Sequence, residues 1–238
     1  SDVAKSAAGL VLLDDNFEII SAAIIEGRRI LSNIRKTFVY LMSNSLDEVF
    51  VIGGSLLLSI PLPLTALQII WVNLFTGSLP ALAFSYDEDF DHERGNKKVS
   101  RTLFSVPVKV LTFGIGLASS LLLFVMYYLL IRSGVEESLA KSVFFVCFAS
   151  YILVIAYSFR SLKKSLFSYP IFSNRRLNYS VGLAFVLTII TVTLPPLRNL
   201  FGLSAIPFVW VWFILAWLVL NMALVEGAKY FFRRHTNA

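Results

Sequence analysis

Six long apolar segments, separated by short polar stretches, dominate the hydrophobic pattern from residue 37 onward. Each is close to the roughly 20 residues that an α-helix needs to cross a hydrocarbon core about 30 Å thick. Pro61–Pro63 form the turn between the first two, and Pro195, Pro196 and Pro207 mark the ends of the last two. The pattern therefore predicts an all-α polytopic membrane protein with six transmembrane helices, near 37–59, 64–84, 107–131, 140–159, 179–195 and 207–228.

The chain before the first span has a different pattern, typical of a water-exposed segment. The apolar run Gly9–Leu13, followed by the polar Asp14–Asn16, predicts a short buried strand and a turn. Helical spacing of apolar residues from Phe17 onward predicts a helix that continues through residues 28–36 into the first span. Such a helix either couples a soluble domain to the membrane or lies as a basic helix on lipid headgroups, and periodicity alone does not separate the two.

Polar side chains interrupt the first two spans near their middles, where an unpaired charge costs at least ~2.5 kcal/mol. Such groups are retained mainly where they face one another and bind something, and their oxygens are the ligands that Ca²⁺ or Mg²⁺ prefers. Gly77 and Pro80 weaken the second span, so backbone carbonyls there are further candidate ligands. We expect an intramembrane cation site, with Glu48, Asn73 and Thr76 as metal ligands. The full set of candidates is Glu48, Asn73, Thr76, Ser45, Asn44 and Asp47.

Each candidate also has a structural interpretation. Asn44, Asn73 and Thr76 are of types that hydrogen-bond between membrane helices, and taken alone they favour that role. Glu48 is different, because no span centre carries a basic residue that would pair with it. Asp47 lies about 100° around the helix from Glu48, so it faces either another helix or a water path.

Composition and charge support the membrane assignment. The 238-residue chain is 57% hydrophobic, with a mean hydropathy of +0.74, which is too apolar for a water-soluble domain. A single cysteine, Cys147, excludes a disulfide framework, and two histidines argue against a histidine-based metal centre. The net charge of +6 does not indicate nucleic acid as a partner, because the basic residues flank the spans.

The basic residues also predict the orientation. Of the 21 Lys and Arg residues, all but Arg132, Lys141 and Arg198 fall on the side of the membrane that holds the N-terminus. Positive charge marks cytoplasmic loops, so both termini are expected in the cytoplasm, as an even number of spans requires.

Seven segments of the chain carry further motifs: Ser1–Ala8, Leu10–Phe17, Glu26–Arg29, Asn33–Lys36, Pro61–Leu64, Gln68–Thr76 and Leu79–Ala81. Taken together, they resemble motifs of P-type cation-transporting ATPases, nearest to the group of calcium and sodium–potassium pumps. The resemblance implies that residues 1–27 are a strand–helix remnant of the family's α/β phosphorylation domain, that 28–36 form the stalk, and that 37–238 form membrane helices five to ten.

The resemblance also implies site residues. Glu48 matches the family's fifth-helix carboxylate, Asn73 and Thr76 match sixth-helix ligands, and Ser45 stands where calcium pumps carry an asparagine. Gly77 replaces the aspartate that usually follows the threonine, and the fourth span has no acidic residue. Binding of two calcium ions is therefore not expected.

The resemblance further implies that Asp47, an extra carboxylate, would compensate in part for the missing aspartate.

A second group of implications concerns the whole pump. The family's Asp-Lys-Thr-Gly-Thr and Gly-Asp-Gly motifs are absent from the sequence, so the chain is an enzyme only as part of a complete pump that uses Mg and ATP. Its expected partners are the lipid bilayer of the plasma (inner) membrane, the N-terminal pump domains with membrane helices one to four, and a small cation.

Two other interpretations stay open from the sequence. One is a passive cation carrier or channel subunit of six helices, which would need no nucleotide. The other is a membrane anchor without transport, in which Glu48 is permanently protonated.

Overall fold

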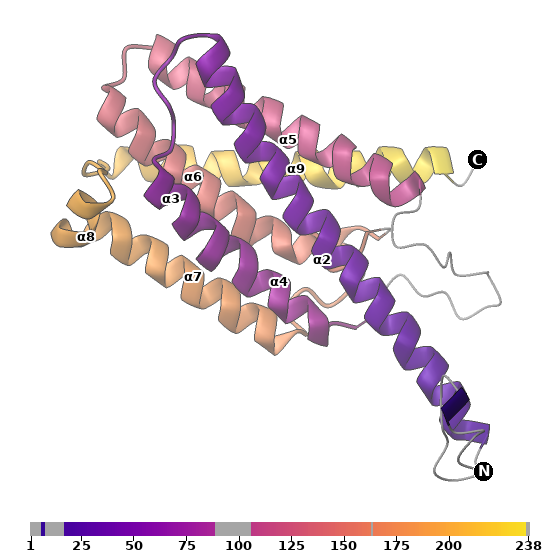
Figure 1. Ribbon diagram of the computed structural model, residues 1–238. Coiled ribbons are helices and arrows are strands. Elements are labelled where there is room, and N and C mark those ends of the chain that lie inside the picture. The colour runs from indigo at the N-terminus through magenta and orange to yellow at the C-terminus, as the bar shows by residue number, and fades with distance from the viewer. Residues whose placement is uncertain (1–5, 8–16, 89–105, 163, 237–238) are drawn as a thin grey trace.

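A single long helix leads into the bundle from the N-terminal side. The computed structural model describes residues 6–7, 17–88, 106–162 and 164–236, and the predicted strand at residues 9–13 lies outside these ranges. Helix α2 (Phe17–Leu57) has 41 residues, about 62 Å at 1.5 Å per residue and twice the thickness of the hydrocarbon core. Its N-terminal part projects from the bundle (Figure 1). The predicted continuous helix from Phe17 into the first span is confirmed.

Five helical stretches within the described ranges are long and apolar enough to cross a membrane. They coincide with the last five predicted spans and run over Ala66–Tyr86, Thr112–Arg132, Glu137–Ser158, Arg175–Thr193 and Val209–Phe231. The first predicted span, 37–59, falls in α2 and is not among the five, because the polar residues between 43 and 48 interrupt its apolar sequence. The chain is an all-α, multi-pass membrane protein, and the sixth crossing, by α2, stays a prediction.

The second span is built from four short elements rather than one uniform helix. They are α3 (Ala66–Trp71), the π-helix η1 (Val72–Ser78), α4 (Leu79–Ala83) and the 3₁₀ turn η2 (Phe84–Tyr86). Thr65 begins the span with a capping box in which Gln68 N–H donates to the Thr65 hydroxyl and Thr65 N–H to the Gln68 side chain. The π-helix lies where Gly77 was expected to weaken the helix, and π-helical turns occur frequently at functional sites.

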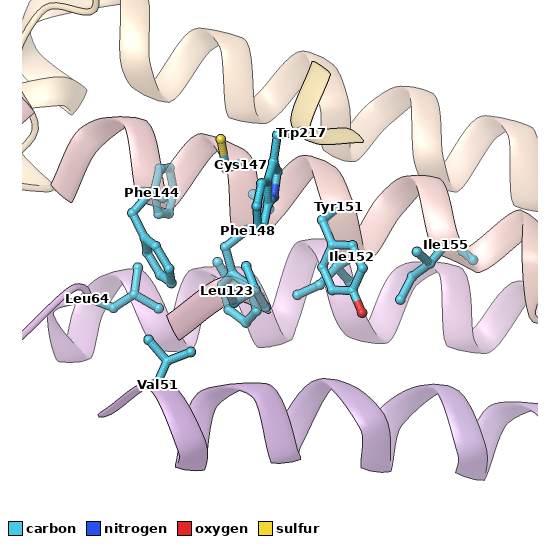
Figure 2. Close-up of a cluster of buried hydrophobic side chains, with 14 of the residues drawn as sticks. Val51, Leu64, Leu123, Phe144, Cys147, Phe148, Tyr151, Ile152, Ile155 and Trp217 are labelled. Atoms are coloured by element: carbon cyan, nitrogen blue, oxygen red, sulfur yellow. The ribbon is translucent and has the colours of Figure 1, made fainter. Parts of the chain in front are cut away.

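Helix α6 lies at the centre of the bundle. The remaining elements are α5 (Val106–Arg132), α6 (Glu137–Ser158), η3 (Leu166–Ser168), α7 (Arg175–Thr193), α8 (Pro195–Leu200) and α9 (Val209–Thr236). Helix α6 contacts α5, α7, α9 and η1, and most of its side chains are buried, as expected for a helix that is apolar all round. Figure 2 shows Phe148 and Ile152 of α6 in one buried cluster with Val51 of α2, Leu123 of α5 and Trp217 of α9.

Helices α2 and α5 approach each other closely at two glycines. A Cβ atom on Gly54 would lie 2.7 Å from the ring of Phe124, and one on Gly116 would lie 2.8 Å from the side chain of Leu46. Association of membrane helices depends on such close packing, because lipid provides no hydrophobic driving force between helices. The two glycines therefore set the distance between α2 and the rest of the bundle.

We expect Gly54→Ala to destabilise the full-length protein by about 1–3 kcal/mol, because the added methyl group overpacks against Phe124. The measurement is the thermal unfolding temperature of the purified full-length protein. Gly53→Ala is the matched control, because a Cβ atom there meets nothing within 4 Å. Equal losses in the two variants would contradict the close packing of α2 on α5.

Candidate cation site

The structure brings Glu48 of α2 together with Asn73 of η1. The Asn73 amide Nδ2 donates to both carboxylate oxygens of Glu48, at 2.8 Å to Oε1 and 3.0 Å to Oε2. Glu48 is the last residue of the polar stretch of α2, and Asn73 is the second residue of the π-helix. The contact places a carboxylate and an amide side chain from two different helices side by side.

This pair lies on an outer face of the described bundle. Glu48 is half-buried and Asn73 is exposed. The neighbouring apolar residues on this face are also exposed, with 67% of Val49, 63% of Ile70 and 54% of Leu74 accessible. An ionised carboxylate facing lipid is costly, so this face is suited to contact with further protein.

Thr76 is buried one turn beyond Asn73, on the side of the π-helix that faces the bundle. Its hydroxyl donates to the Val72 carbonyl at 2.7 Å, and its own carbonyl accepts a 2.9 Å hydrogen bond from the Tyr40 hydroxyl. The same Tyr40 hydroxyl lies 3.1 Å from the Ile152 carbonyl of α6. The Thr76 hydroxyl hydrogen is thus used within its own helix, and the oxygen keeps a lone pair.

Asp47 lies about 100° around α2 from Glu48 and faces into the bundle. It is fully buried, and its Oδ1 lies 2.7 Å from the Ser119 hydroxyl and 2.8 Å from the Ser120 hydroxyl, both on α5. The Tyr151 hydroxyl of α6 also approaches this carboxyl group. Of the two alternatives open from the sequence, Asp47 therefore faces other helices.

Asn44 and Ser45 occupy different sides of α2. Asn44 is buried, and its side-chain amide makes no hydrogen bond of normal geometry with other described residues. Ser45 is exposed, and its hydroxyl donates to the Leu41 carbonyl one turn earlier, at 3.0 Å. The six candidates thus divide into the Glu48–Asn73 pair, three buried residues (Asn44, Asp47 and Thr76), and Ser45, which is bonded to its own helix.

The charges of both carboxylates lack a basic partner within the described part of the chain. Ion pairs there join Arg29 to Glu26, Lys141 to Glu137, Arg160 to Asp87 and Lys229 to Glu226. The described residues also contain no cluster of three or more His, Cys, Asp or Glu side chains that would hold a metal ion. A cation at Glu48 would therefore be bound by a mixture of carboxylate, amide, hydroxyl and backbone oxygens.

Arg160 forms a buried ion pair that the sequence did not indicate. Its guanidinium donates to Asp87 Oδ1 and Oδ2 at 2.7–3.0 Å, and both side chains are fully buried. The same group donates to the carbonyls of Pro170 and Ile171 and to the Ser173 hydroxyl. It therefore connects the end of the second span to the loop that follows α6.

Helix α2 contacts the backbone of this ion pair's Asp87 and of the next residue, Glu88. Asn33 Nδ2 donates to the Asp87 carbonyl at 3.0 Å, and Lys36 Nζ donates to the Glu88 carbonyl at 2.9 Å. Lys36 is fully buried although it carries a charge. We refer to Asn33, Lys36, Asp87 and Arg160 as the stalk clamp, because these residues hold α2 against the end of the second span.

Sequence reasoning missed the partners of Asp47 and the whole stalk clamp. Two adjacent serines, Ser119 and Ser120, in an otherwise apolar span were an available signal for an inward polar contact. No local pattern distinguishes Asp87 and Arg160 from the other charged residues at span ends, because their partnership joins positions 73 residues apart.

Comparison with known proteins identifies the family. The model of the family described as "Cation transporting ATPase, C-terminus" matches residues 61–231, well over half of the chain. The chain belongs to this family. It is 34% identical over 224 residues to calcium-transporting ATPase 1 of Bacillus cereus, covering 87% of the chain and 25% of that protein.

Two further relatives are also calcium-transporting ATPases. The chain is 35% identical to the calcium-transporting ATPase of Bacillus subtilis, over 87% of the chain and 23% of the relative. It is 30% identical to human calcium-transporting ATPase type 2C member 1, over 90% of the chain and 24% of the relative. The resemblance seen in the motifs is confirmed, and the chain spans about a quarter of the length of these relatives.

Proposed function

We propose that this chain is the membrane transport part of an ATP-driven P-type cation pump. In this proposal Glu48 and Asn73 bind the transported cation, with Thr76 and the carbonyls of the π-helix as further ligands. The pairing of Glu48 with Asn73 across two helices is the observation that carries it. Calcium is the cation that we propose, because the relatives are named as calcium-transporting ATPases.

The exposure of this pair supports a site completed by other parts of the pump. A half-buried carboxylate among exposed Val49, Ile70 and Leu74 is stable in a membrane only when something covers it. We propose that membrane helices one to four pack on this face and supply the remaining ligands. Gly77 has no side chain to contribute a carboxylate here, so we propose that one cation binds at this pair.

The length of α2 supports coupling to an ATP-driven domain. We propose that residues 1–27 belong to the phosphorylation domain, that 28–36 form the stalk, and that Mg-ATP acts on the upstream domains. The stalk clamp would transmit movements of α2 to the second span, because Asn33 and Lys36 hold the residues that follow it. We also propose that residues 37–238 form the membrane domain, with both termini in the cytoplasm and the plasma (inner) membrane as location.

The test is transport by the full-length pump reconstituted into vesicles. We expect calcium uptake that requires hydrolysable ATP and Mg, and no uptake with a non-hydrolysable nucleotide. A passive carrier or channel would instead give calcium flux without nucleotide. Such flux, or hydrolysis of ATP without any dependence on a cation, would contradict the proposed function.

A further inference from the structure

An apolar groove lies between α5 and α9, and neither Glu48 nor Asn73 is among the residues that line it. Its volume is about 750 Å³. Leu122, Met126 and Leu129 line it from α5, and Trp210, Phe213 and Leu220 line it from α9. Leu129 is 58% exposed and Leu220 is 50% exposed, so the groove opens toward the surroundings of the bundle.

The length of the groove matches one leaflet of a bilayer. The lining residues of α5 extend from Leu122 to Arg132, which corresponds to about 15 Å of helix. Half of a hydrocarbon core about 30 Å thick is also about 15 Å. A transmembrane helix of a partner would be expected to contact the full thickness, whereas an acyl chain occupies one leaflet only.

A positive charge lies at one end of this groove. Arg132 ends α5 and lines the groove, and its guanidinium is 5.4 Å from the centre of the Tyr128 ring. The described ion pairs do not include Arg132, and its side chain is exposed. Trp210, near the start of α9, is at the same end, where aromatic residues of membrane proteins commonly meet the headgroups.

We propose that the groove binds one phospholipid, with an acyl chain between α5 and α9 and its phosphate at Arg132. The guanidinium suits this role, because its planar array of donors matches phosphate oxygens and is weakly hydrated. By the distribution of basic residues, the lipid belongs to the non-cytoplasmic leaflet. This site is separate from the cation site, and its existence does not depend on the proposed transport function.

The experiment uses the full-length pump and phosphatidylglycerol that carries a photoreactive group in one acyl chain. We expect cross-links in the peptides that hold 122–132 and 210–220. Labelling at sub-saturating lipid should fall about tenfold in Arg132→Gln, as loss of a charged hydrogen bond predicts. Leu129→Trp, which fills the groove and keeps Arg132, should reduce labelling as well.

Arg198→Gln is the matched control, because Arg198 is a basic residue of the same membrane side that does not line the groove. Its labelling should equal that of the wild type, and thermal unfolding should show that all variants fold. Unchanged labelling in both Arg132→Gln and Leu129→Trp would mean ordinary contact with bulk lipid. Absence of any cross-link would mean that another part of the pump covers the groove. Either result would overturn the proposal.

Discussion

Replacement of Glu48 by glutamine is expected to remove cation-dependent stabilisation and cation transport from the full-length pump. A cation present at 100 times its dissociation constant stabilises the wild type by about 2.7 kcal/mol, if it binds the folded state alone. Glutamine keeps the size of the side chain and one of the two hydrogen bonds from Asn73, but it removes the negative charge. The measurement is the thermal unfolding temperature across a panel of cations, followed by calcium uptake.

Glu137→Gln provides the control for Glu48→Gln. Glu137 is an exposed acidic residue of α6 whose carboxylate pairs with Lys141 at the surface, so its loss should leave the cation response intact. If the wild type shows no cation dependence, or if Glu48→Gln keeps it, then the Glu48–Asn73 pair is a packing contact and the site lies elsewhere. If Glu48→Gln loses the response to a single cation of the panel, that cation would also be identified as the transported ion.

Replacement of Arg160 by glutamine should have the largest effect on stability, about 3–5 kcal/mol, because it leaves the Asp87 carboxylate buried without its charged partner. The substitution also removes the hydrogen bonds that the Arg160 guanidinium donates to Pro170, Ile171 and Ser173. The measurement is the thermal unfolding of the full-length pump for Arg160→Gln, Asp87→Asn and the double variant. The double variant should recover part of the loss, since it no longer buries an unpaired charge.

The exposed pair of Lys141 and Glu137 is the matched comparison for the stalk clamp. Its Nζ–Oε1 distance of 2.6 Å is similar to the 2.7 Å of the Arg160–Asp87 pair, but both of its side chains are accessible. Exposed ion pairs contribute about 0–1 kcal/mol, so Lys141→Gln should have little effect. A loss in Arg160→Gln no larger than in Lys141→Gln would show that the buried Arg160–Asp87 pair contributes no more to stability than an exposed one.

The sequence predicted most of the fold, because membrane helices are encoded locally. A run of about 20 apolar residues must satisfy its backbone hydrogen bonds as a helix wherever it lies in the bundle. The last five spans and the turn at Pro61–Pro63 could therefore be placed without knowledge of their neighbours. The continuous helix α2 was also predictable, because apolar residues recur at helical spacing from Phe17 and no proline interrupts it.

The candidate site was only partly predictable. The sequence identified the residue types and a shared helix face, which is sufficient to nominate Glu48 and Asn73. It did not indicate how deeply each residue is buried or which neighbour it meets. Thr76 stays a predicted ligand, and the structure shows that its hydroxyl donates to the Val72 carbonyl.

Local sequence pattern specifies the helices, the turns and the chemical groups that this protein places in the membrane. The directions of Asp47 and Glu48 depend on the packing of the helices, since adjacent residues on a helix differ by about 100° and their surroundings come from distant segments. Glu48 meets Asn73 of η1, and Asp47 meets Ser119 of α5. The ion pair of Arg160 with Asp87 also depends on the packing of the helices, because no local pattern brings these two residues together.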